Sequence, residues 1–300
     1  MDGVPNGQIT NLQRFSLHDG PGVRSTLFLQ GCNLQCVWCH NPESIPLAPV
    51  LLHYANRCVG CGHCVSICPQ GALNAQAAKP NRARCQNCFA CASACPNEAL
   101  TPSSYAQAID DALQAVLADL PFYESSGGGV TISGGEPMLQ PAFTGALLHR
   151  LHALGVHTAL DTAGLVSFAR YEAVLPDVDL FLVDYKAFDS ALHQRLTGVP
   201  NQLIRENIAK LSQQAKALWI RIPIVPGFND APGDLEAIAR DLAQMGFSGQ
   251  VEPLAFHSLG QAKYDALDRS YACAQTRPPG PERMAEIRIL FAAHGLQVRG

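Results

Sequence analysis

The cysteines are the residues of this 300-residue chain whose spacing most directly indicates chemistry. Eleven of the twelve lie between Cys32 and Cys95, and their spacing divides them into one group of three and two groups of four, which leaves Cys273. Clustered thiols in a reducing compartment are typical of metal ligands, and the spacing does not suit a secreted disulfide framework. We therefore expect eleven metal-ligating cysteines and an inert Cys273.

The two groups of four repeat one pattern, C-x2-C-x2-C-x3-C-P, 27 residues apart. The first copy contains Cys58, Cys61, Cys64 and Cys68, and the second contains Cys85, Cys88, Cys91 and Cys95. Bacterial two-cluster ferredoxins have this pattern, and in them the fourth cysteine of each run ligates the cluster of the other run. We predict two [4Fe–4S] clusters, with Cys68 joining the second run and Cys95 joining the first. Zinc ribbons use pairs of cysteines rather than triples, which makes zinc the weaker alternative.

The group of three contains Cys32, Cys36 and Cys39, which can hold three iron atoms of a further [4Fe–4S] cluster. The two repeats take the other eight clustered cysteines, so this cluster has no fourth thiolate nearby. One iron atom would then stay open to an external ligand. A structural zinc site is the alternative, in which His40 supplies the fourth ligand.

Alternating apolar and amphipathic stretches outside residues 48–100 predict strands followed by helices. The expected strands are 23–30, 130–133, 156–160, 179–183, 218–225 and 250–255. The expected helices are 103–120, 141–154, 190–196, 235–245 and 281–294. Six β/α units indicate an α/β fold in which residues 1–47 and 101–300 form a partial (β/α)6 barrel. The cysteine repeats at 48–100 indicate an inserted ferredoxin-like domain with two clusters.

Polar residues follow the ends of five of these six strands. They are the Cys32 group, Gly134-Gly135-Glu136, Asp161-Thr162, Asp184-Tyr185-Lys186 and His257. The carboxyl ends of parallel strands meet at one edge, which carries the active site in barrel-like α/β folds. Each residue alone is most simply a capping or turn residue, but five groups on one rim predict a functional site.

The composition limits the classes of partner. Apolar residues make up 47% of the chain and charged residues 15%, which suits a folded protein with a buried core. The net charge of −4 provides no basic field, so we expect no nucleic acid partner. No apolar run approaches the ~18 residues of a membrane span, and the first residues lack a signal-peptide pattern. We therefore expect a cytoplasmic protein with no membrane partner.

Several motifs together resemble one enzyme family. Cys-x3-Cys-x2-Cys after the first strand resembles the cluster motif of radical S-adenosylmethionine enzymes. HDGPGVR at 18–24, FLQGCN at 28–33, WCHNPES at 38–44, SGGGVT at 126–131, SGGEP at 133–137 and DYK at 184–186 resemble motifs of the glycyl-radical-enzyme activating enzymes. The resemblance extends from about Gln13 to about Tyr264. The double cysteine repeat is similar to the insert of the longer subgroup, which the pyruvate formate-lyase activases lack.

The resemblance implies reductive cleavage of S-adenosylmethionine to methionine and a 5′-deoxyadenosyl radical. That radical would take a hydrogen atom from one glycine of a partner glycyl radical enzyme. Three [4Fe–4S] clusters are implied, with S-adenosylmethionine bound to the open iron of the Cys32 group. The reductant would be a flavodoxin- or ferredoxin-type protein, and the repeats would relay its electrons or serve in docking or stability.

The resemblance also implies roles for residues of the rim. The residues matched to S-adenosylmethionine are Trp38, Cys39 and His40 beside the adenine, Gly134, Gly135 and Glu136 near the methionine amino group, Asp184, Tyr185 and Lys186 along methionine and ribose, and His257. Asp161 and Thr162 match a family site for a monovalent cation. Asp19 is the candidate contact for the partner's loop, with a turn residue as the alternative. Pro253-Leu254-Ala255-Phe256 replaces the family's Leu-Pro-Tyr/Phe-His run before His257.

Two other functions stay open at this point. A ferredoxin-type electron carrier would use the eight repeated cysteines but leaves the Cys32 group and about 250 residues without a task. A radical enzyme that acts on a small molecule or a peptide would use the repeats as auxiliary clusters. The position of the repeats between the first and second strands favours the activating enzyme.

Overall fold

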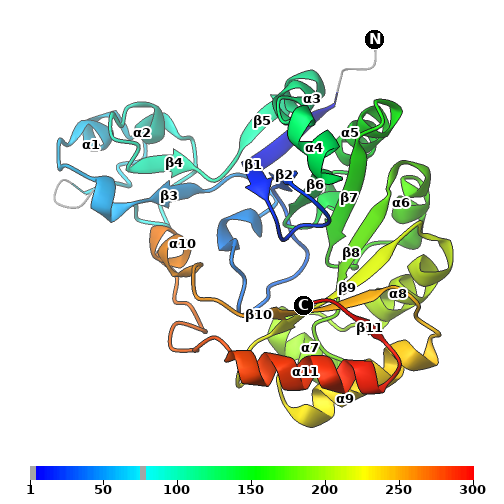
Figure 1. Cartoon of the computed structure of the whole chain (residues 1–300). Coiled ribbons are helices and arrows are strands. Elements are labelled where there is room, and N and C mark those ends of the chain that lie inside the picture. Colours follow the sequence, from blue (N-terminus) through cyan, green and yellow to red (C-terminus); the bar gives the residue numbers. More distant parts are fainter. Residues whose placement is uncertain (1–4, 75–78) are drawn as a thin grey trace.

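A computed structural model describes residues 5–74 and 79–300 of the chain, and its main feature is a nine-stranded sheet (Figure 1). The strands lie in the order β11, β10, β9, β8, β7, β6, β2, β1, β5. Their bounds are β1 Asn6–Ser16, β2 Arg24–Leu29, β5 Tyr105–Ala108, β6 Gly129–Gly134, β7 His157–Thr162, β8 Leu180–Asp184, β9 Leu218–Ile224, β10 Gln250–Ala255 and β11 Gln297–Val298. Every pairing from β2 to β11 is parallel, whereas β1 pairs antiparallel with β2 and β5.

The six strands expected from the sequence are all present as the parallel part of this sheet, in chain order. The first four residues of β8 are buried. A parallel strand that is covered on both faces has a continuous run of apolar residues, as β8 does. The expected helix at 103–120 is wrong in its first part, because Tyr105–Ala108 pairs with β1 before α3 begins at Ile109. The sequence does not predict β1, whose residues are mostly polar and only partly buried.

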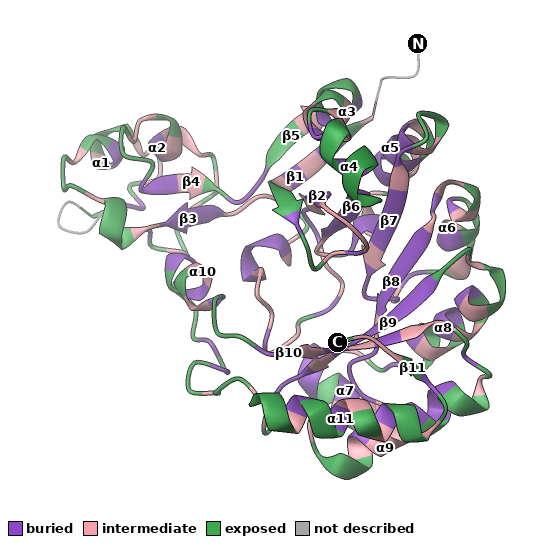
Figure 2. Ribbon diagram, viewed as in Figure 1, coloured by how far each residue is buried: buried purple, intermediate pink, exposed green. Residues whose placement is uncertain are grey.

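Most helices outside the cysteine repeats cover the convex face of the sheet, and Figure 2 shows their outer residues exposed and the strands buried. The helices outside the repeats are α3 Ile109–Leu117, α4 Leu120–Ser126, α5 Pro141–Ala153, α6 Phe168–Glu172, α7 Ser190–Thr197, α8 Gln202–Gln214, α9 Pro232–Gln244, α10 Gln261–Ala266 and α11 Pro281–Ala293. Helix α10 lies apart from the others, beside β3 (Figure 1). One apolar core joins both layers, with Leu147 of α5, Ile208 of α8 and Ile238 of α9 fully buried in it. None of the helices in the described part of the chain is long and apolar enough to cross a membrane.

The cysteine repeats form a separate small unit beside the main sheet (Figure 1). Strands β3 (Leu51–His53) and β4 (Leu100–Pro102) pair antiparallel and bring the two ends of this segment together. Between them lie the short helices α1 (His63–Ile67) and α2 (Ala90–Ser93). The unit has its own apolar cluster, in which Leu51, Leu73 and Leu100 pack with the buried thiols of Cys64 and Cys91.

Candidate functional site

The loop that carries Cys32, Cys36 and Cys39 follows β2 and is fixed by its backbone. The N–H of Gln35 donates to the carbonyl oxygen of Thr197 at 2.7 Å, and the N–H of Val37 donates to that of Leu196 at 2.9 Å. Both acceptors lie in the last turn of α7, where carbonyl groups lack helical partners. The end of α7 therefore holds the segment between the first and third cysteines of the loop.

The three thiols of this loop share one largely buried space. Burial raises the pKa of Cys36 to about 12, and it also raises the pKa values of Cys32 and Cys39 above the ordinary thiol range. Cys32 raises the pKa of Cys36, and both raise the pKa of Cys39, while the Lys186 ammonium lowers the pKa values of Cys32 and Cys36. A metal must displace the protons of such thiols, so metal binding would release protons from the loop.

These thiols fit a four-iron cluster better than a single zinc ion. All three are free rather than disulfide-bonded. Among residues 5–74 and 79–300, no three His, Cys, Asp or Glu side chains converge closely enough to chelate one ion. Each thiolate of a four-iron cluster binds a different iron atom, so the sulfur atoms need not meet at one point. His40, which the zinc alternative would use as the fourth ligand, is stacked on His257, with 3.8 Å between ring centroids.

Gly134, the last residue of β6, and Gly135 lie against the end of β2, where a side chain would not fit. Gly134 has a φ of +123°, and a Cβ there would lie 2.1 Å from the backbone nitrogen of Leu29. A Cβ on Gly135 would lie 2.1 Å from the carbonyl oxygen of Gly31, directly before Cys32. Both glycines thus permit two backbones to approach, which brings the glycine run against the cysteine loop.

Glu136 is fully buried and connects β6 to β7. Its Oε1 accepts from the N–H of Met138 at 3.0 Å, and its Oε2 accepts from Thr162 Oγ1 at 2.7 Å and the N–H of Ala163 at 2.9 Å. Burial raises the pKa of this carboxyl, and the three donors oppose that shift. Thr162, an expected cation ligand, also forms a hydrogen bond with the hydroxyl of Tyr171 at 2.8 Å. Glu136 and Thr162 therefore both have hydrogen-bond partners within the protein.

The run after β8 divides between the two faces of the sheet. Lys186 Nζ donates to Asp184 Oδ2 at 2.5 Å on the side of the cysteine loop. Burial lowers the pKa of Lys186, but Asp184 and the Cys36 thiol outweigh burial and raise it overall. The Tyr185 hydroxyl instead donates to Asp241 of α9, because successive side chains of an extended segment alternate between faces. The structure therefore brings Asp184 and Lys186 to the candidate site and places Tyr185 away from it.

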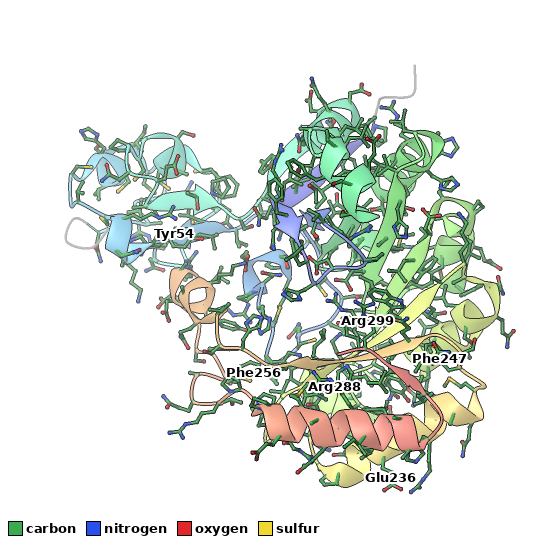
Figure 3. All side chains as sticks on the ribbon, in the orientation of Figure 1. Tyr54, Glu236, Phe247, Phe256, Arg288 and Arg299 are labelled. Atoms are coloured by element: carbon green, nitrogen blue, oxygen red, sulfur yellow. The ribbon has the colours of Figure 1, made fainter. Side chains whose placement is uncertain are left out.

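Trp38, His40 and His257 line the other side of the cysteine loop. The Trp38 ring is buried among apolar residues that include Phe256, which lies directly after β10 (Figure 3). His40 is partly buried and His257 is exposed. Burial, with a smaller contribution from His257, lowers the pKa of His40 to about 4. Cys273 is fully buried in the same apolar cluster, with its Sγ 3.7 Å from the carbonyl oxygen of Val37.

Arg221 of β9 is a central residue of the site that motif matching does not single out. Its buried guanidinium lies 3.3 Å from Asp161, 3.4 Å from Glu252 and 3.8 Å from Asp19. Burial lowers the pKa of Arg221, but the surrounding carboxylates outweigh burial and raise it. Burial raises the pKa of Asp161 to about 6, against the opposing effect of Arg221. A single arginine inside an otherwise apolar strand is the signal in the sequence that could have found it.

Asp19 lies inside the concave side of the sheet and is tied to its own loop. Its Oδ2 accepts from Ser16 Oγ at 2.5 Å and from Thr26 Oγ1 at 2.8 Å. The carbonyl oxygen of His18 accepts from Arg221 at 2.7 Å. These contacts fit the alternative of a loop-fixing residue, and contact of Asp19 with the partner's loop stays a prediction.

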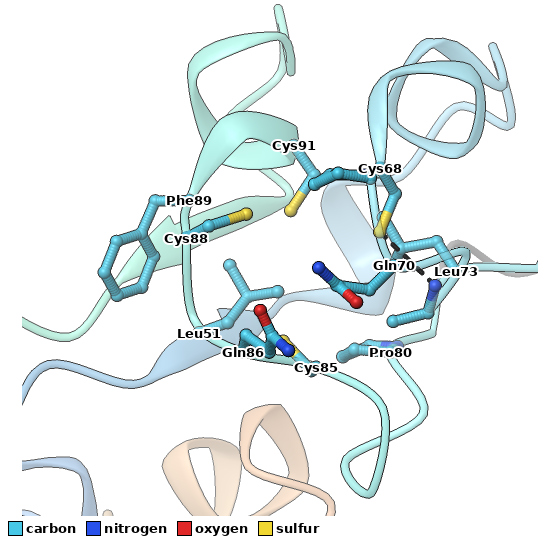
Figure 4. A pocket seen from close by; sticks show the side chains of 12 residues that line it. Leu51, Cys68, Gln70, Leu73, Pro80, Cys85, Gln86, Cys88, Phe89 and Cys91 are labelled. Carbon is cyan, nitrogen blue, oxygen red and sulfur yellow. Dashed lines mark hydrogen bonds between the residues drawn. The ribbon is translucent and has the colours of Figure 1, made fainter.

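The eight cysteines of the repeats line two separate cavities. One cavity is lined by Cys58, Cys61, Cys64 and Cys95. The other is lined by Cys68, Cys85, Cys88 and Cys91. Figure 4 shows Cys68, Cys88 and Cys91 with their sulfur atoms turned toward the same space. All eight are free thiols, and the fourth cysteine of each run lies with the first three of the other run.

Comparisons with known families agree with this division of the cysteines. A 4Fe-4S dicluster domain matches residues 51–96. A 4Fe-4S single cluster domain matches residues 18–50 and 81–204. The two matches assign iron–sulfur clusters to the repeats and to the part of the chain that contains the Cys32 loop.

Solved structures share the fold. A domain of a pyruvate-formate lyase-activating enzyme from Bacteroides vulgatus is 29% identical, with a TM-score of 0.50 over 58% of this chain and 98% of its own. A radical SAM methyltransferase from Sphaerobacter thermophilus has a TM-score of 0.56 at 14% identity, over 97% of this chain and 76% of its own. The chain therefore has the fold of a radical SAM enzyme, with the cysteine loop directly after β2.

Relatives narrow this class. The benzylsuccinate synthase activating enzyme of Thauera aromatica is 40% identical over 97% of this chain and 91% of its own length. The trans-4-hydroxy-L-proline dehydratase activating enzyme of Clostridioides difficile is 38% identical over 98% of this chain and 99% of its own length. The chain belongs to the activating enzymes of glycyl radical enzymes. The isethionate sulfite-lyase activating enzyme of Nitratidesulfovibrio vulgaris, 42% identical over 89% of this chain and 90% of its own, is a further relative.

Replacing Tyr185 tests the division between the two faces of the sheet. Tyr185→Phe removes a hydroxyl that donates to the buried Asp241 carboxylate, so we expect a loss of about 1.5–3 kcal/mol in unfolding free energy. We expect unchanged affinity for S-adenosylmethionine, measured by anaerobic calorimetry. Asp184→Asn is the matched variant on the opposite face and should weaken that binding. Equal weakening by both variants would contradict the placement of Tyr185.

Proposed function

We propose that this chain activates a partner glycyl radical enzyme from a site built on Cys32, Cys36 and Cys39. These three thiolates would hold a [4Fe–4S] cluster, which would supply the electron for the cleavage of S-adenosylmethionine to methionine and the 5′-deoxyadenosyl radical, and that radical would take hydrogen from the partner's glycine. The observation that carries the proposal is a three-thiol loop fixed against the glycine run and the Asp184–Lys186 pair, in a chain 40% identical to a known activating enzyme along nearly its whole length.

Carboxylates beside the loop are the candidate partners of the positive groups of S-adenosylmethionine. Asp184 pairs with Lys186, and Asp19, Asp161 and Glu252 surround Arg221. Arg299 lies 3.5 Å from Glu252, and Arg24 interacts with Asp19, so cationic side chains of the protein balance these carboxylates. The sulfonium and ammonium groups of S-adenosylmethionine, and a monovalent cation beside Asp161 and Thr162, would share carboxylates with these cations; Arg221 lies 3.3 Å from Asp161.

The remaining candidate residues border this space from three directions. Gly134, Gly135 and Glu136 fix the end of β6 against the loop, so their backbone would face the methionine part of the co-substrate. Trp38 contributes its backbone, since its ring is buried in the protein. The stacked rings of His40 and His257 provide an aromatic face on the side matched to the adenine.

We further propose two structural units and three [4Fe–4S] clusters. Residues 1–47 and 101–300 form the partial (β/α)6 barrel that holds the Cys32 group and S-adenosylmethionine. Residues 48–100 form the ferredoxin-like insert, and its two four-cysteine cavities suit one cluster each. The insert would pass electrons from a flavodoxin- or ferredoxin-type reductant to the Cys32 group. The expected location of the protein is the cytoplasm.

The two rival functions have less support. An electron carrier of ferredoxin type does not need the β6–β8 rim that surrounds the Cys32 loop. A radical enzyme for small molecules or peptides would share this fold, but the relatives above, each matched over about nine-tenths or more of this chain, are all named as activating enzymes.

Electron paramagnetic resonance of the partner tests the function. A candidate glycyl radical enzyme, incubated anaerobically with the chain, S-adenosylmethionine and dithionite, should develop the doublet of a glycyl radical. Cys36→Ala should abolish the doublet and lower the iron content by about four atoms from about twelve. Cys273→Ala removes a buried thiol outside all three groups and should keep both the doublet and the iron. A doublet of parental size with Cys36→Ala would refute the assignment of the site.

Single cysteine variants test the pairing within the insert. Cys68→Ala and Cys85→Ala should perturb the same cluster, because both thiols line one cavity although 17 positions separate them in the sequence. Cys95→Ala should perturb the other cluster, together with Cys58→Ala. Redox-titrated resonance spectra of the reduced variants distinguish the clusters. Matching spectral losses for Cys68→Ala and Cys58→Ala would show that each run holds its own cluster.

A further inference from the structure

Helix α10 (Gln261–Ala266) contacts both the cysteine-repeat unit and the segment that follows the Cys32 loop. It packs against β3 of the repeat unit and against the short helical turn Pro42–Ser44. Figure 1 shows α10 between the β3–β4 pair and the strand β10. Neither the cysteine motifs nor the proposed function assigns a role to this helix.

On the side of the Cys32 loop, α10 is fixed next to the third thiol. Lys263 Nζ donates to Asn41 Oδ1 at 2.6 Å and to Glu43 Oε1 at 2.5 Å. Gly260, directly before the helix, lies so close that a Cβ there would be 3.3 Å from the carbonyl oxygen of Cys39. Tyr264 is buried in the apolar cluster that contains Trp38. A shift of α10 would therefore move the backbone around Cys39.

On the side of the repeats, three contacts hold α10 and the turn after it. Arg82 donates to the carbonyl oxygen of Ala266 at 2.8 Å and also to that of Leu51 in β3. Lys79 pairs with Asp268 at 2.7 Å, and Leu52 is buried against Ala266 and Leu267.

The Arg82 contact begins next to a cluster thiol. The N–H of Cys85 donates to the carbonyl oxygen of Asn81 at 2.9 Å, so residues 81–85 form one helical turn. Side chains three positions apart on such a turn lie on the same face, which places Cys85 and Arg82 together. Leu51, whose carbonyl group Arg82 holds, lines the same cavity as Cys85.

We propose that Arg82 and α10 are a latch that fixes the Cys68/Cys85/Cys88/Cys91 set at a constant separation from the Cys32 loop, so that electrons pass between them. The latch runs from the Cys85 turn through Arg82 to the end of α10, and from the start of α10 to Cys39. Arg82 acts here as a positioning residue. This inference rests on the proposed function, since it requires electrons to leave the insert for the site.

Stored electrons test the latch without any protein reductant. Holoenzyme reduced photochemically with deazaflavin and then desalted anaerobically would hold about three electrons, one in each cluster. Each cleavage of added S-adenosylmethionine consumes one electron: the sulfur keeps an electron pair as methionine, and the 5′-carbon takes a hydrogen atom from a buffer thiol to give 5′-deoxyadenosine. The first methionine formed uses the electron stored at the Cys32 group. The second and third methionines can form only after electrons have been transferred from the clusters of the insert to that group.

Arg82→Met keeps the apolar stem and removes the guanidinium N–H groups that donate to Ala266 and Leu51. We expect the first methionine to form at the parental rate and the later two to form about tenfold more slowly, as for other losses of positioning remote from the reacting atoms. Arg84→Met is the matched control, because Arg84 is an exposed arginine two positions away, and it should behave as the parent throughout. Unchanged cluster resonance spectra would confirm that the difference is one of transfer.

Asp268→Asn decides the question if Arg82→Met loses iron. Asp268 is an exposed partner of Lys79 outside the insert, so its replacement weakens the latch without touching a cluster cavity. Slower second and third methionines would support the latch. Parental rates for these two would overturn it, as would a parent protein that releases only the first methionine. A parent that releases none would instead contradict the proposed function.

Discussion

The site depends on the close approach of two backbones where the parallel strands β2 and β6 end. The N–H of Gly135 donates to the carbonyl oxygen of Leu29 at 2.9 Å, and the N–H of Glu136 donates to that of Gly31 at 2.7 Å. These bonds continue the register of the sheet, in which Leu29 lies opposite Gly134. Any side chain at the two glycines would separate the strand ends and move the cysteine loop that begins one residue later. The position of the thiols is therefore set by the sheet register rather than by the loop itself.

Register also explains how so much charge is buried on the concave side of the sheet. Arg221 lies opposite Asp184 on one neighbouring strand and opposite Glu252 on the other, so one cation faces a carboxylate on each side. Buried charges are tolerated only when they are paired, and removing one partner of such a set typically costs about 3–5 kcal/mol. The arginine thus permits carboxylates at the ends of the strands where we propose that S-adenosylmethionine binds, and Lys186 pairs with Asp184 nearer the thiols.

Apolar runs were sufficient to predict six of the seven parallel strands, because strands buried on both faces carry their burial in their composition. β1, β5 and the two-residue β11 could not be found this way, since they lie at the two sides of the sheet, partly exposed, and depend on pairing with distant residues. Cysteine spacing predicted which thiols share a cavity, because the repeated pattern is typical of two-cluster ferredoxins, in which the fourth cysteine of each run ligates the cluster of the other run. The orientation of Tyr185 is not local: the DYK run alone does not tell which of its side chains faces the loop. The motifs did not indicate Arg221 either, because its partners lie on neighbouring strands that are distant in the sequence.

The place of the repeat unit in the chain follows from the end of β2. The buried Gln30 side chain donates to the carbonyl oxygens of Glu43 and Pro46 at 3.0 and 2.6 Å and accepts from Ser103 Oγ at 3.2 Å. One side chain thus fixes the chain both before and after the repeat unit, and the β3–β4 pairing continues this closure. Because the two junctions are held together independently of what lies between them, a long insertion adds little closure entropy to the fold. Cluster-binding sequence can therefore be accommodated beside the cysteine loop without altering the sheet that positions that loop.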